Sequence, residues 1–406
     1  MKNIEKYVFT AIFIAGVGIY SVLSIVNASE QIYECCSETQ IESTDDAKKV
    51  ISDIEDEMVS NVAARYGVIE IYGETNKLLG KNEINGFEYV RDKNGFLSLG
   101  NFWNEVHDTD VKPLAVETEH FYESLKKKGI NMLYVSFPQK VSDEWTDGYS
   151  GIPYDDFSYK NNMFMIQMRK YRIPNLDLTK TLEESGLPYE EMFFKTDHHW
   201  TSKAAFLGFQ AILDKLDEMG VELDPNGYYR NFDNYKVIHY EDMMLGSSGR
   251  SVGQRYAGGR ENFDLYYIDD DTEYEFTYGD NKTIYGKASE TIIDFNVPEK
   301  IEKEPDSIYT LSMYDMYMRG IRPKVRIDNI NSQGPKVLMI TDSYASPIGA
   351  WLAPMCSRLD FLWANRNDDE AIDRYIEEND YDLVIVGLYP NDVNSEFIRF
   401  SSSDDN

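Results

Sequence analysis

The stretch Lys336–Pro347, KVLMITDSYASP, joins an apolar run to a polar end. Its opening residues have the continuous apolar character of a strand that is buried on both faces of a parallel sheet. Asn131–Phe137 (NMLYVSF) and Leu383–Val386 (LVIV) have the same character, and segments with helical periodicity lie between these runs. The alternation predicts an α/β domain whose mostly parallel sheet is covered by helices on both faces.

The serine of this stretch, Ser343, follows the predicted strand directly, in the sequence Thr341-Asp342-Ser343. Ligand sites of open parallel sheets lie beyond the carboxyl ends of the strands, so Ser343 stands where a nucleophile would act. If a helix begins there, its free N–H groups and dipole could stabilise an oxyanion. The alternative is that Asp342 or Ser343 only caps that helix.

A second polar stretch, Phe193–Thr201 (FFKTDHHWT), holds two of the five histidines in the chain. In an extended segment, residues two apart face the same side, so Asp197 and His199 would point one way and His198 the other. A serine nucleophile needs a base, and the base needs a group that fixes its tautomer; His199 and Asp197 fit these two roles. Thr201 would cap the next helix. The alternative is a purely structural histidine.

The same cluster could hold a metal ion, because Asp and His are both metal ligands. Adjacent histidines on a strand diverge, however, and therefore chelate one ion poorly. The Asp-His-His tripeptide is similar to one in a phosphoesterase family that binds manganese, but the further Asp-rich motifs which that family needs on earlier strands are missing from this sequence. We therefore expect no metal.

A third stretch, Leu383–Val393 (LVIVGLYPNDV), carries a predicted strand into a loop that contains Asn391. An Asn side-chain amide at a strand end is a suitable oxyanion donor. The alternative is an ordinary Pro-Asn-Asp turn.

Together these blocks resemble the SGNH hydrolase superfamily, and in particular the DHHW family and its relatives among the alginate O-acetyltransferases. Asp197-His198-His199-Trp200 is the signature of the DHHW family, and Thr341-Asp342-Ser343 is similar to the Gly-Asp-Ser block that carries the nucleophile, with Thr341 in place of glycine. The motif order is permuted, because Asp-x-His precedes the serine. The resemblance extends to Leu78–Lys81 and Gly246–Gly253.

The resemblance implies a catalytic triad of Ser343, His199 and Asp197, Asn391 as an oxyanion candidate, and neither cofactor nor metal. Residues in or beside the blocks are substrate-binding candidates: His198, Trp200, Tyr344 and Arg250. It implies serine-dependent acyl transfer, usually of acetyl, onto an exported or cell-envelope polysaccharide, with a multi-pass membrane acyltransferase as the supplier of acyl groups. Two alternatives stay open: a polysaccharide acetyl esterase with the same triad, and a non-catalytic glycan-binding envelope scaffold.

The amino terminus predicts a membrane anchor. Lys2 and Lys6 precede Tyr7–Val26, an uncharged apolar run that is long enough to cross a bilayer as a helix. The lysines favour a cytoplasmic amino end, with the rest of the chain outside the membrane. A cleaved signal peptide is the alternative, because small residues follow at Val26-Asn27-Ala28. We therefore expect an anchor or signal peptide over 1–30 and a single-pass membrane protein with an extracytoplasmic catalytic domain.

Beyond the apolar run, the sequence suggests a polar stalk over 27–42 and one helix over 43–66. In the division into domains, the stalk and helix are assigned to residues 31–75. The catalytic domain is expected over 76–406. Its turn-rich start contains Asn94-Gly95 between short apolar runs, which predicts a hairpin. The Tyr- and Gly-rich segment of about 221–330 is expected to be an irregular, β-rich insertion.

Charge and cysteine content exclude two classes of function. The chain has 40 Lys and Arg residues against 71 Asp and Glu residues, a net charge of -31, which repels nucleic acid. The three cysteines, Cys35, Cys36 and Cys356, form neither a disulfide framework nor a zinc-binding pattern.

Overall fold

A computed structural model describes residues 2–38, 43–100, 111–142, 157–279, 281–363, 365 and 372–400. The chain divides into two compact units, Met1–Thr75 and Asn76–Asn406. Its three cysteines carry free thiols, and Cys356 is buried.

The first unit consists of helices. Helix α1 spans Lys2–Glu38, so the segment predicted to be a polar stalk is helical as far as Glu38. Helix α2 (Thr44–Ser60) starts at a capping box in which the Ser43 side chain and Asp46 bond each other's backbone N–H. The helix expected over 43–66 is broken after Ser60, and the chain continues as α3 (Arg65–Leu78). Ile4–Ser37 is the one described helix long and apolar enough to cross a membrane, and a signal sequence has the same properties.

The second unit is built on a sheet that has eight strands within the described residues, in the order β5-β4-β13-β11-β12-β10-β8-β9. The strands from β5 to β12 run parallel, and β10, β8 and β9 continue the sheet antiparallel. The bounds are β4 (Asn131–Ser136), β5 (Asn175–Asp177), β8 (Tyr274–Tyr278), β9 (Lys282–Gly286), β10 (Lys324–Asn329), β11 (Lys336–Thr341), β12 (Arg358–Trp363) and β13 (Leu383–Leu388).

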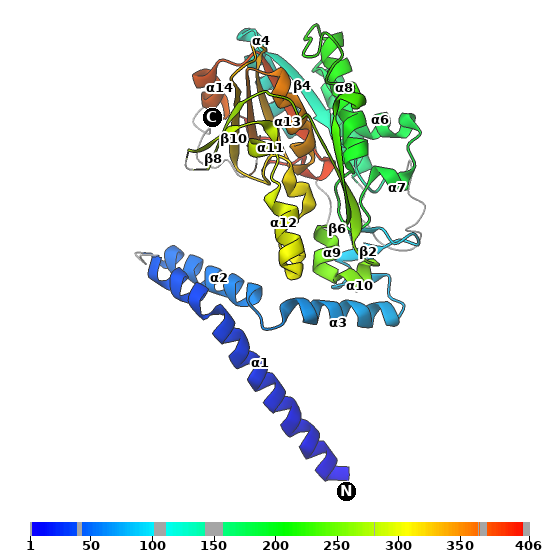
Figure 1. The fold of residues 1–406 in the computed structure, drawn as a ribbon, viewed down its shortest axis with the longest axis vertical. Coiled ribbons are helices and arrows are strands. Elements are labelled where there is room, and N and C mark those ends of the chain that lie inside the picture. Colours follow the sequence, from blue (N-terminus) through cyan, green and yellow to red (C-terminus); the bar gives the residue numbers. More distant parts are fainter. Residues whose placement is uncertain are drawn as a thin grey trace. The chain divides into compact units, whose positions relative to one another are not determined.

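Helices cover both faces of this sheet, as predicted. Successive side chains of a strand point to opposite faces, and those of β11 accordingly enter two different cores. Val337 and Met339 of β11 join the core that includes α8 (Ser202–Glu218) and α13 (Ser346–Leu352). Leu338 and Ile340 join the core that includes α4 (Lys112–Lys127), α5 (Ser158–Lys170) and α14 (Ile372–Asn379). Figure 1 shows α8 and α14 on opposite sides of the strands. The strands are therefore apolar throughout because both of their faces are buried.

The segment predicted as an irregular insertion is better ordered than expected. Its strands β8, β9 and β10 extend the main sheet, and β6 (Lys236–Met244) and β7 (Glu261–Tyr267) form a separate antiparallel ribbon that packs beside α8. The predicted hairpin around Gly95 is present as well, in a small sheet of β1 (Glu83–Ile84), β2 (Tyr89–Arg91) and β3 (Leu97–Leu99). Figure 1 shows the β6–β7 ribbon reaching toward β2 and α9.

Short helices complete the unit. They are α6 (Leu178–Ser185), α7 (Tyr189–Met192), α9 (Ser247–Val252), α10 (Gln254–Ala257), α11 (Ala288–Thr291) and α12 (Asn296–Lys303). The 3₁₀ turns are η1 (Phe232–Asn234), η2 (Pro305–Tyr309), η3 (Met313–Met316), η4 (Ser343–Ala345), η5 (Ala353–Met355) and η7 (Pro390–Asp392).

Candidate active site

Ser343 lies where the sequence places it, directly beyond the carboxyl end of β11. The preceding Asp342 caps η4, because its carboxylate accepts a hydrogen bond of 2.9 Å from the Tyr344 N–H. The Thr341 hydroxyl donates to the Gly387 carbonyl at 2.8 Å and so ties the end of β11 to the neighbouring β13. Asp342, and not Ser343, therefore caps this turn, and the Ser343 hydroxyl contacts another residue, described below.

The loop that carries Asp197 begins and ends at a β-bridge between Phe193 and Trp200. Inside it, the backbone bends instead of running extended. The rings of His198 and His199 consequently lie side by side, with centroids 3.9 Å apart. The prediction that the two histidines face opposite sides is wrong, because two-residue periodicity holds only for an extended backbone. Thr201 does cap α8, as predicted, by accepting from the Ala204 N–H.

A continuous chain of contacts joins the three predicted triad residues. The Asp197 Oδ1 atom lies 2.5 Å from His199 Nδ1, and it also accepts the His199 backbone N–H at 2.9 Å. The other ring nitrogen, His199 Nε2, lies 2.7 Å from the Ser343 Oγ. These distances are within the reach needed for direct proton transfer. The carboxylate thereby favours the tautomer with a proton on Nδ1, which leaves Nε2 free to accept from the serine hydroxyl.

The backbone around Asp197 is held by the first residue of β7. The Glu261 carboxylate accepts hydrogen bonds from the N–H groups of Lys195, at 2.6 Å, and Thr196, at 2.8 Å. It also accepts from the Thr196 hydroxyl at 2.6 Å. Glu261 was absent from the sequence-based site, since a lone glutamate at the start of a strand has no distinguishing pattern.

The block Gly246–Gly253, singled out by family resemblance, contacts the same loop. The Ser247 N–H donates to the second carboxylate oxygen of Asp197, Oδ2, at 2.7 Å. Gly246 packs so closely that a Cβ atom there would lie 2.2 Å from the Asp197 Cβ. Only glycine fits this position, and α9 can therefore begin directly against the aspartate.

These contacts keep Asp197 ionised. Burial alone would raise the pKa of its carboxyl, but the nearby His199 and His198 and the hydrogen bonds from His199 hold that pKa well below its ordinary value. An ionised aspartate is suited to orienting an imidazole and to stabilising the imidazolium that forms when the ring takes a proton.

Aromatic rings enclose His199. Tyr314, from η3, stacks on His199, and its hydroxyl accepts a 3.0 Å hydrogen bond from Trp200 Nε1. Trp200 and Tyr344 are themselves 0% and 1% exposed, and the Tyr344 hydroxyl donates to the His198 carbonyl. Trp200 and Tyr344 were predicted to bind substrate. Their burial corrects that prediction, because both pack behind the site instead of facing solvent.

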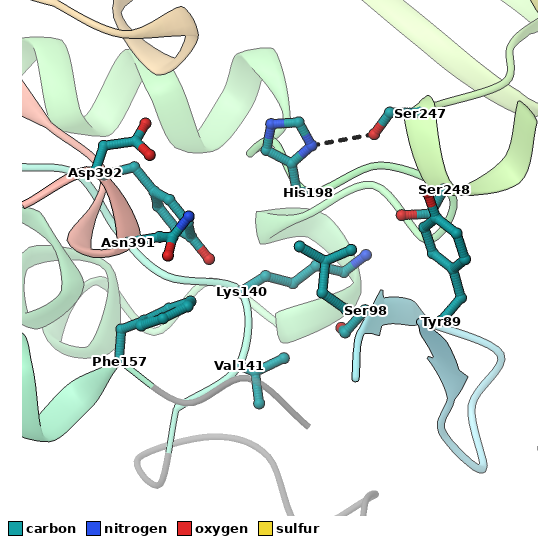
Figure 2. Close-up of a pocket in the computed structure, with 12 residues that line it drawn as sticks. Tyr89, Ser98, Lys140, Val141, Phe157, His198, Ser247, Ser248, Asn391 and Asp392 are labelled. Atoms are coloured by element: carbon teal, nitrogen blue, oxygen red, sulfur yellow. Dashed lines mark hydrogen bonds between the residues drawn. The ribbon is translucent and has the colours of Figure 1, made fainter. Parts of the chain in front are cut away.

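A cavity of about 280 Å³ adjoins His198 (Figure 2). His198 lines it, keeps 41% of its side chain accessible, and lies 3.1 Å from the Ser247 hydroxyl through its Nδ1. Partial burial and the neighbouring His199 lower the pKa of His198 and so favour its neutral ring. The cavity lining comprises Tyr89, Ser98, Leu99, Lys140, Val141, Phe157, His198, Ser247, Ser248, Tyr389, Asn391 and Asp392.

The remaining predicted site residues have different positions. Asn391 is exposed and lines the cavity, with its backbone carbonyl accepting from Lys160 at 3.1 Å. Arg250, on α9, is half-buried and does not line the cavity, although its charge acts on His198. Of the four predicted substrate-binding residues, His198 is the one in the cavity wall.

Two carboxyl groups form a pair near the serine: Asp342 precedes Ser343 and is buried, whereas Asp392, in η7, is half-buried and lines the cavity. Asp342 and Asp392 share a hydrogen bond, and burial, followed by the charge of the partner, raises the pKa of Asp342 well above its ordinary value. Burial also raises the pKa of Asp392, to about 6, against the opposing charge of Lys160. Both shifts favour the protonated form of the pair.

Asp197, His198 and His199 each offer a metal-ligand atom, and these atoms lie within 4.8 Å of one another. The ligand atoms already have partners: Asp197 Oδ1 bonds His199 Nδ1, and His198 Nδ1 bonds the Ser247 hydroxyl. An ion in this cluster would have to replace the contact that orients the base. The expectation of a metal-free site stays a prediction.

Comparison with known families matches this region. Residues 106–256, which include the Asp197 loop, match the family model described as the SGNH hydrolase-like domain of the acetyltransferase AlgX. No curated protein matches the chain.

Solved structures share the fold over most of the chain. PatB1 of Bacillus cereus has a TM-score of 0.59 and 18% identity, covering 77% of this chain and 99% of that one. PatB1 with a sulfonyl adduct has a TM-score of 0.57 and 16% identity, covering 77% and 97%. A DHHW family protein from Eubacterium siraeum has a TM-score of 0.58 and 17% identity, covering 78% and 99%. These structures confirm the fold class, and the family model that matches residues 106–256 confirms the resemblance to the SGNH hydrolase superfamily.

Proposed function

We propose that this chain, with its SGNH hydrolase-like domain of acetyltransferase type, is a serine-dependent O-acetyltransferase. The observation that carries the proposal is the contact chain from Asp197 through His199 to Ser343, with distances of 2.5 and 2.7 Å. Such a chain activates a serine hydroxyl, which is a weak nucleophile without an adjacent base.

The geometry supports a two-step transfer. The Ser343 Oγ attacks the carbonyl carbon of an acetyl ester while His199 Nε2 takes the hydroxyl proton. The imidazolium returns this proton to the leaving alcohol, and an acetyl-serine remains. An acceptor hydroxyl then gives its proton to His199 and attacks the acetyl carbon, and the Ser343 oxygen leaves and regains a proton from the imidazolium.

The negative charge on the carbonyl oxygen needs hydrogen-bond donors. We assign this role to the N–H of Ser343, which is the first residue of η4 and so has no partner inside that turn, and to the side-chain amide of Asn391. Asn391 is suited to it because its amide lies in the cavity wall rather than in the core.

The acceptor we propose is an exported or cell-envelope polysaccharide. Aromatic rings, hydroxyls and an amide line the cavity beside His198, and such groups suit a sugar ring. With α1 as its anchor, the catalytic domain would lie outside the cytoplasmic membrane, beside a multi-pass acyltransferase that supplies acetyl groups. Protease added to intact spheroplasts should then digest the chain beyond residue 30, whereas full protection would refute this topology.

Two other functions stay open. A polysaccharide acetyl esterase would use the same acetyl-serine, with water as the acceptor. A glycan-binding scaffold would use the cavity without chemistry.

One experiment separates the three functions. The protein is incubated with an acetyl ester donor, with and without oligosaccharides, and the products are identified. Acetylated oligosaccharide supports transfer, and free acetate alone supports hydrolysis. Failure of Ser343 to react with a sulfonyl fluoride, a probe prompted by the sulfonyl adduct of PatB1, would leave only the scaffold.

A further inference from the structure

A buried lysine, Lys140, lies beside the catalytic loop and has no part in the proposed chemistry. It follows β4, and it is 2% exposed although it lines the cavity. Figure 2 shows its side chain extending between His198 and Ser98. A cation at such a position is costly to bury unless its donors are satisfied.

The ammonium group of Lys140 donates to three backbone carbonyls. Its Nζ lies 2.6 Å from the carbonyl oxygen of Asp197 and 3.1 Å from that of Lys195, both in the catalytic loop. It lies 2.7 Å from the carbonyl oxygen of Leu97, in β3. An ammonium has three N–H donors, so these three carbonyls match its capacity.

These bonds join two separate parts of the site. Asp197, whose carboxylate touches His199, has its own carbonyl held by Lys140 and its loop N–H groups held by Glu261. One side of the loop backbone therefore faces a cation and the other a carboxylate. The loop bends and is not part of the main sheet, so the hydrogen bonds between strands do not fix its backbone. The hydrogen bonds to Lys140 and Glu261 hold it instead.

We infer that Lys140 is a positioning residue, whose ammonium form holds the Asp197 backbone so that His199 stays in line with Ser343. The inference rests on the proposed acyl-transfer function. We call the hydrogen bonds from the Lys140 ammonium to the three carbonyls the clamp. A shift of about 1 Å in a catalytic group can lower the rate about 10²-fold, so loss of the clamp is expected to slow the reaction strongly.

The clamp depends on the protonation state of Lys140. A neutral amine has two N–H donors, and its lone pair would face one carbonyl oxygen. Burial lowers the pKa of Lys140 to about 8, against the opposing charges of Glu261, Asp197 and Asp92. The other ionisable groups near it are Lys195, His198 and Tyr189, whose hydroxyl donates to the Lys140 carbonyl.

Deprotonation of Lys140 at rising pH is expected to change the stability of the protein and its activity in opposite directions. The pKa of Lys140 in the folded state, about 8, lies below the value of about 10.4 expected in an unfolded chain. Between these values the unfolded chain binds more protons, so this group makes the free energy of unfolding rise with pH. A loss of activity above pH 8 through Lys140 would therefore occur without unfolding.

The test is the rate at which a sulfonyl fluoride modifies Ser343 in the full-length protein. It is measured across pH for wild type, Lys140→Met, Lys140→Arg and Lys195→Met, alongside thermal melting. Lys195 is the matched control, since it is an exposed lysine of the same loop whose ammonium lies over the Phe96 ring.

Lys140→Met should react about 10²-fold more slowly, Lys140→Arg should regain part of the rate, and Lys195→Met should stay within about twofold of wild type. The wild-type rate should decline above about pH 8 without melting, and Lys140→Arg should not show that decline. If the Lys140 variants do not fold, the wild-type pH profile decides. An undiminished wild-type rate up to pH 9.5, or equal rates for folded Lys140→Met and wild type, would overturn the inference. An unreactive wild-type Ser343 would instead overturn the proposed function.

Discussion

The ring of Tyr314 lies against the imidazole of His199, with centroids 4.2 Å apart and planes inclined by 20°. The ring of His198 also contacts this imidazole, at 3.9 Å. The Tyr314 hydroxyl accepts from Trp200 Nε1 and donates to the Tyr344 carbonyl at 3.1 Å. Tyr314 is therefore bonded both to the end of the Asp197 loop and to the turn that follows Ser343. The imidazole of His199 is therefore held by stacking as well as by Asp197.

Tyr314→Leu should slow the reaction of Ser343 with a sulfonyl fluoride about tenfold. The change removes a stacked partner of His199, and such contacts contribute about 0.5–1.5 kcal/mol, where 1.4 kcal/mol corresponds to a factor of ten. Tyr314→Phe keeps the ring and should stay within about threefold of wild type. Equal rates for Tyr314→Leu and Tyr314→Phe, with both proteins folded at the assay temperature, would contradict the role of stacking.

The two adjacent histidines should differ in their effect on turnover. His199→Ala should lower the rate of acetyl-serine formation by about 10²–10⁴-fold, because it removes the group that accepts the serine proton. His198→Ala should act mainly on KM for the acceptor, since its ring lines the cavity and contacts His199 only by packing. Steady-state kinetics with an acetyl ester and an oligosaccharide measure both. A larger loss of kcat in His198→Ala would reverse the assignment.

Asn391→Ala should lower kcat by about 10²–10³-fold with little change in KM, as expected for loss of an oxyanion donor. Asn391→Asp is the closer test, because it keeps the shape of the side chain while removing its N–H donors. It should be at least as impaired as Asn391→Ala. Ser98→Ala, at another position in the cavity wall, should change KM alone. An active Asn391→Asp enzyme would show that the oxyanion donors lie elsewhere.

The carboxyl pair predicts a pH dependence of stability. Burial raises the pKa of Asp392 to about 6, above its value in an unfolded chain, so the contribution of this group to stability is present below about pH 4 and is lost as the pH rises through 6. Asp392→Asn removes the ionisation, and its amide can donate to Asp342. The variant should melt higher than wild type at pH 7.5, with a smaller difference at pH 4.5.

Asp233→Asn, at an exposed aspartate, is the control for the loss of one surface charge and should show no such pH dependence. Thermal melting of the three proteins at both pH values measures the effect. A gain for Asp392→Asn that is the same at pH 4.5 and pH 7.5 would contradict the raised pKa.

Sequence patterns predicted the central strands well because both faces of those strands are buried. Val337 to Ile340 alternate between two cores, and such strands carry an uninterrupted apolar run that is visible without a structure. The same reasoning gave no indication that β8, β9 and β10 would extend this sheet. Strands β8 and β10 alternate buried with less buried residues, β9 has no buried residue, and the pairing of β10 with β8 and β12 joins segments far apart in the chain.

The candidate site was predictable where chemistry and local spacing coincide. Asp197, His199 and Ser343 were selected as a triad, and the structure brings them into contact, whereas their catalytic roles stay predictions. Asp197 does meet His199 as expected, but the expectation that His198 points to the opposite side was wrong, since the loop is bent. Lys140 and Tyr314 were missed because neither has a motif, and their bonds to the catalytic segment connect residues 57 and 114 positions apart.

The position of β13 has a consequence for biosynthesis. This strand pairs with β4 on one side and with β11 on the other, so the last strand of the described residues lies inside the sheet, in the middle of its parallel part. A nascent chain cannot complete the sheet until residues Leu383–Leu388 have been made, although β4 appears long before. Pairing of such distant segments is intrinsically slow and leaves strand edges exposed meanwhile. During synthesis, the segment that carries Asp197 and His199 is therefore made well before β13, which pairs with β11, the strand that precedes Ser343.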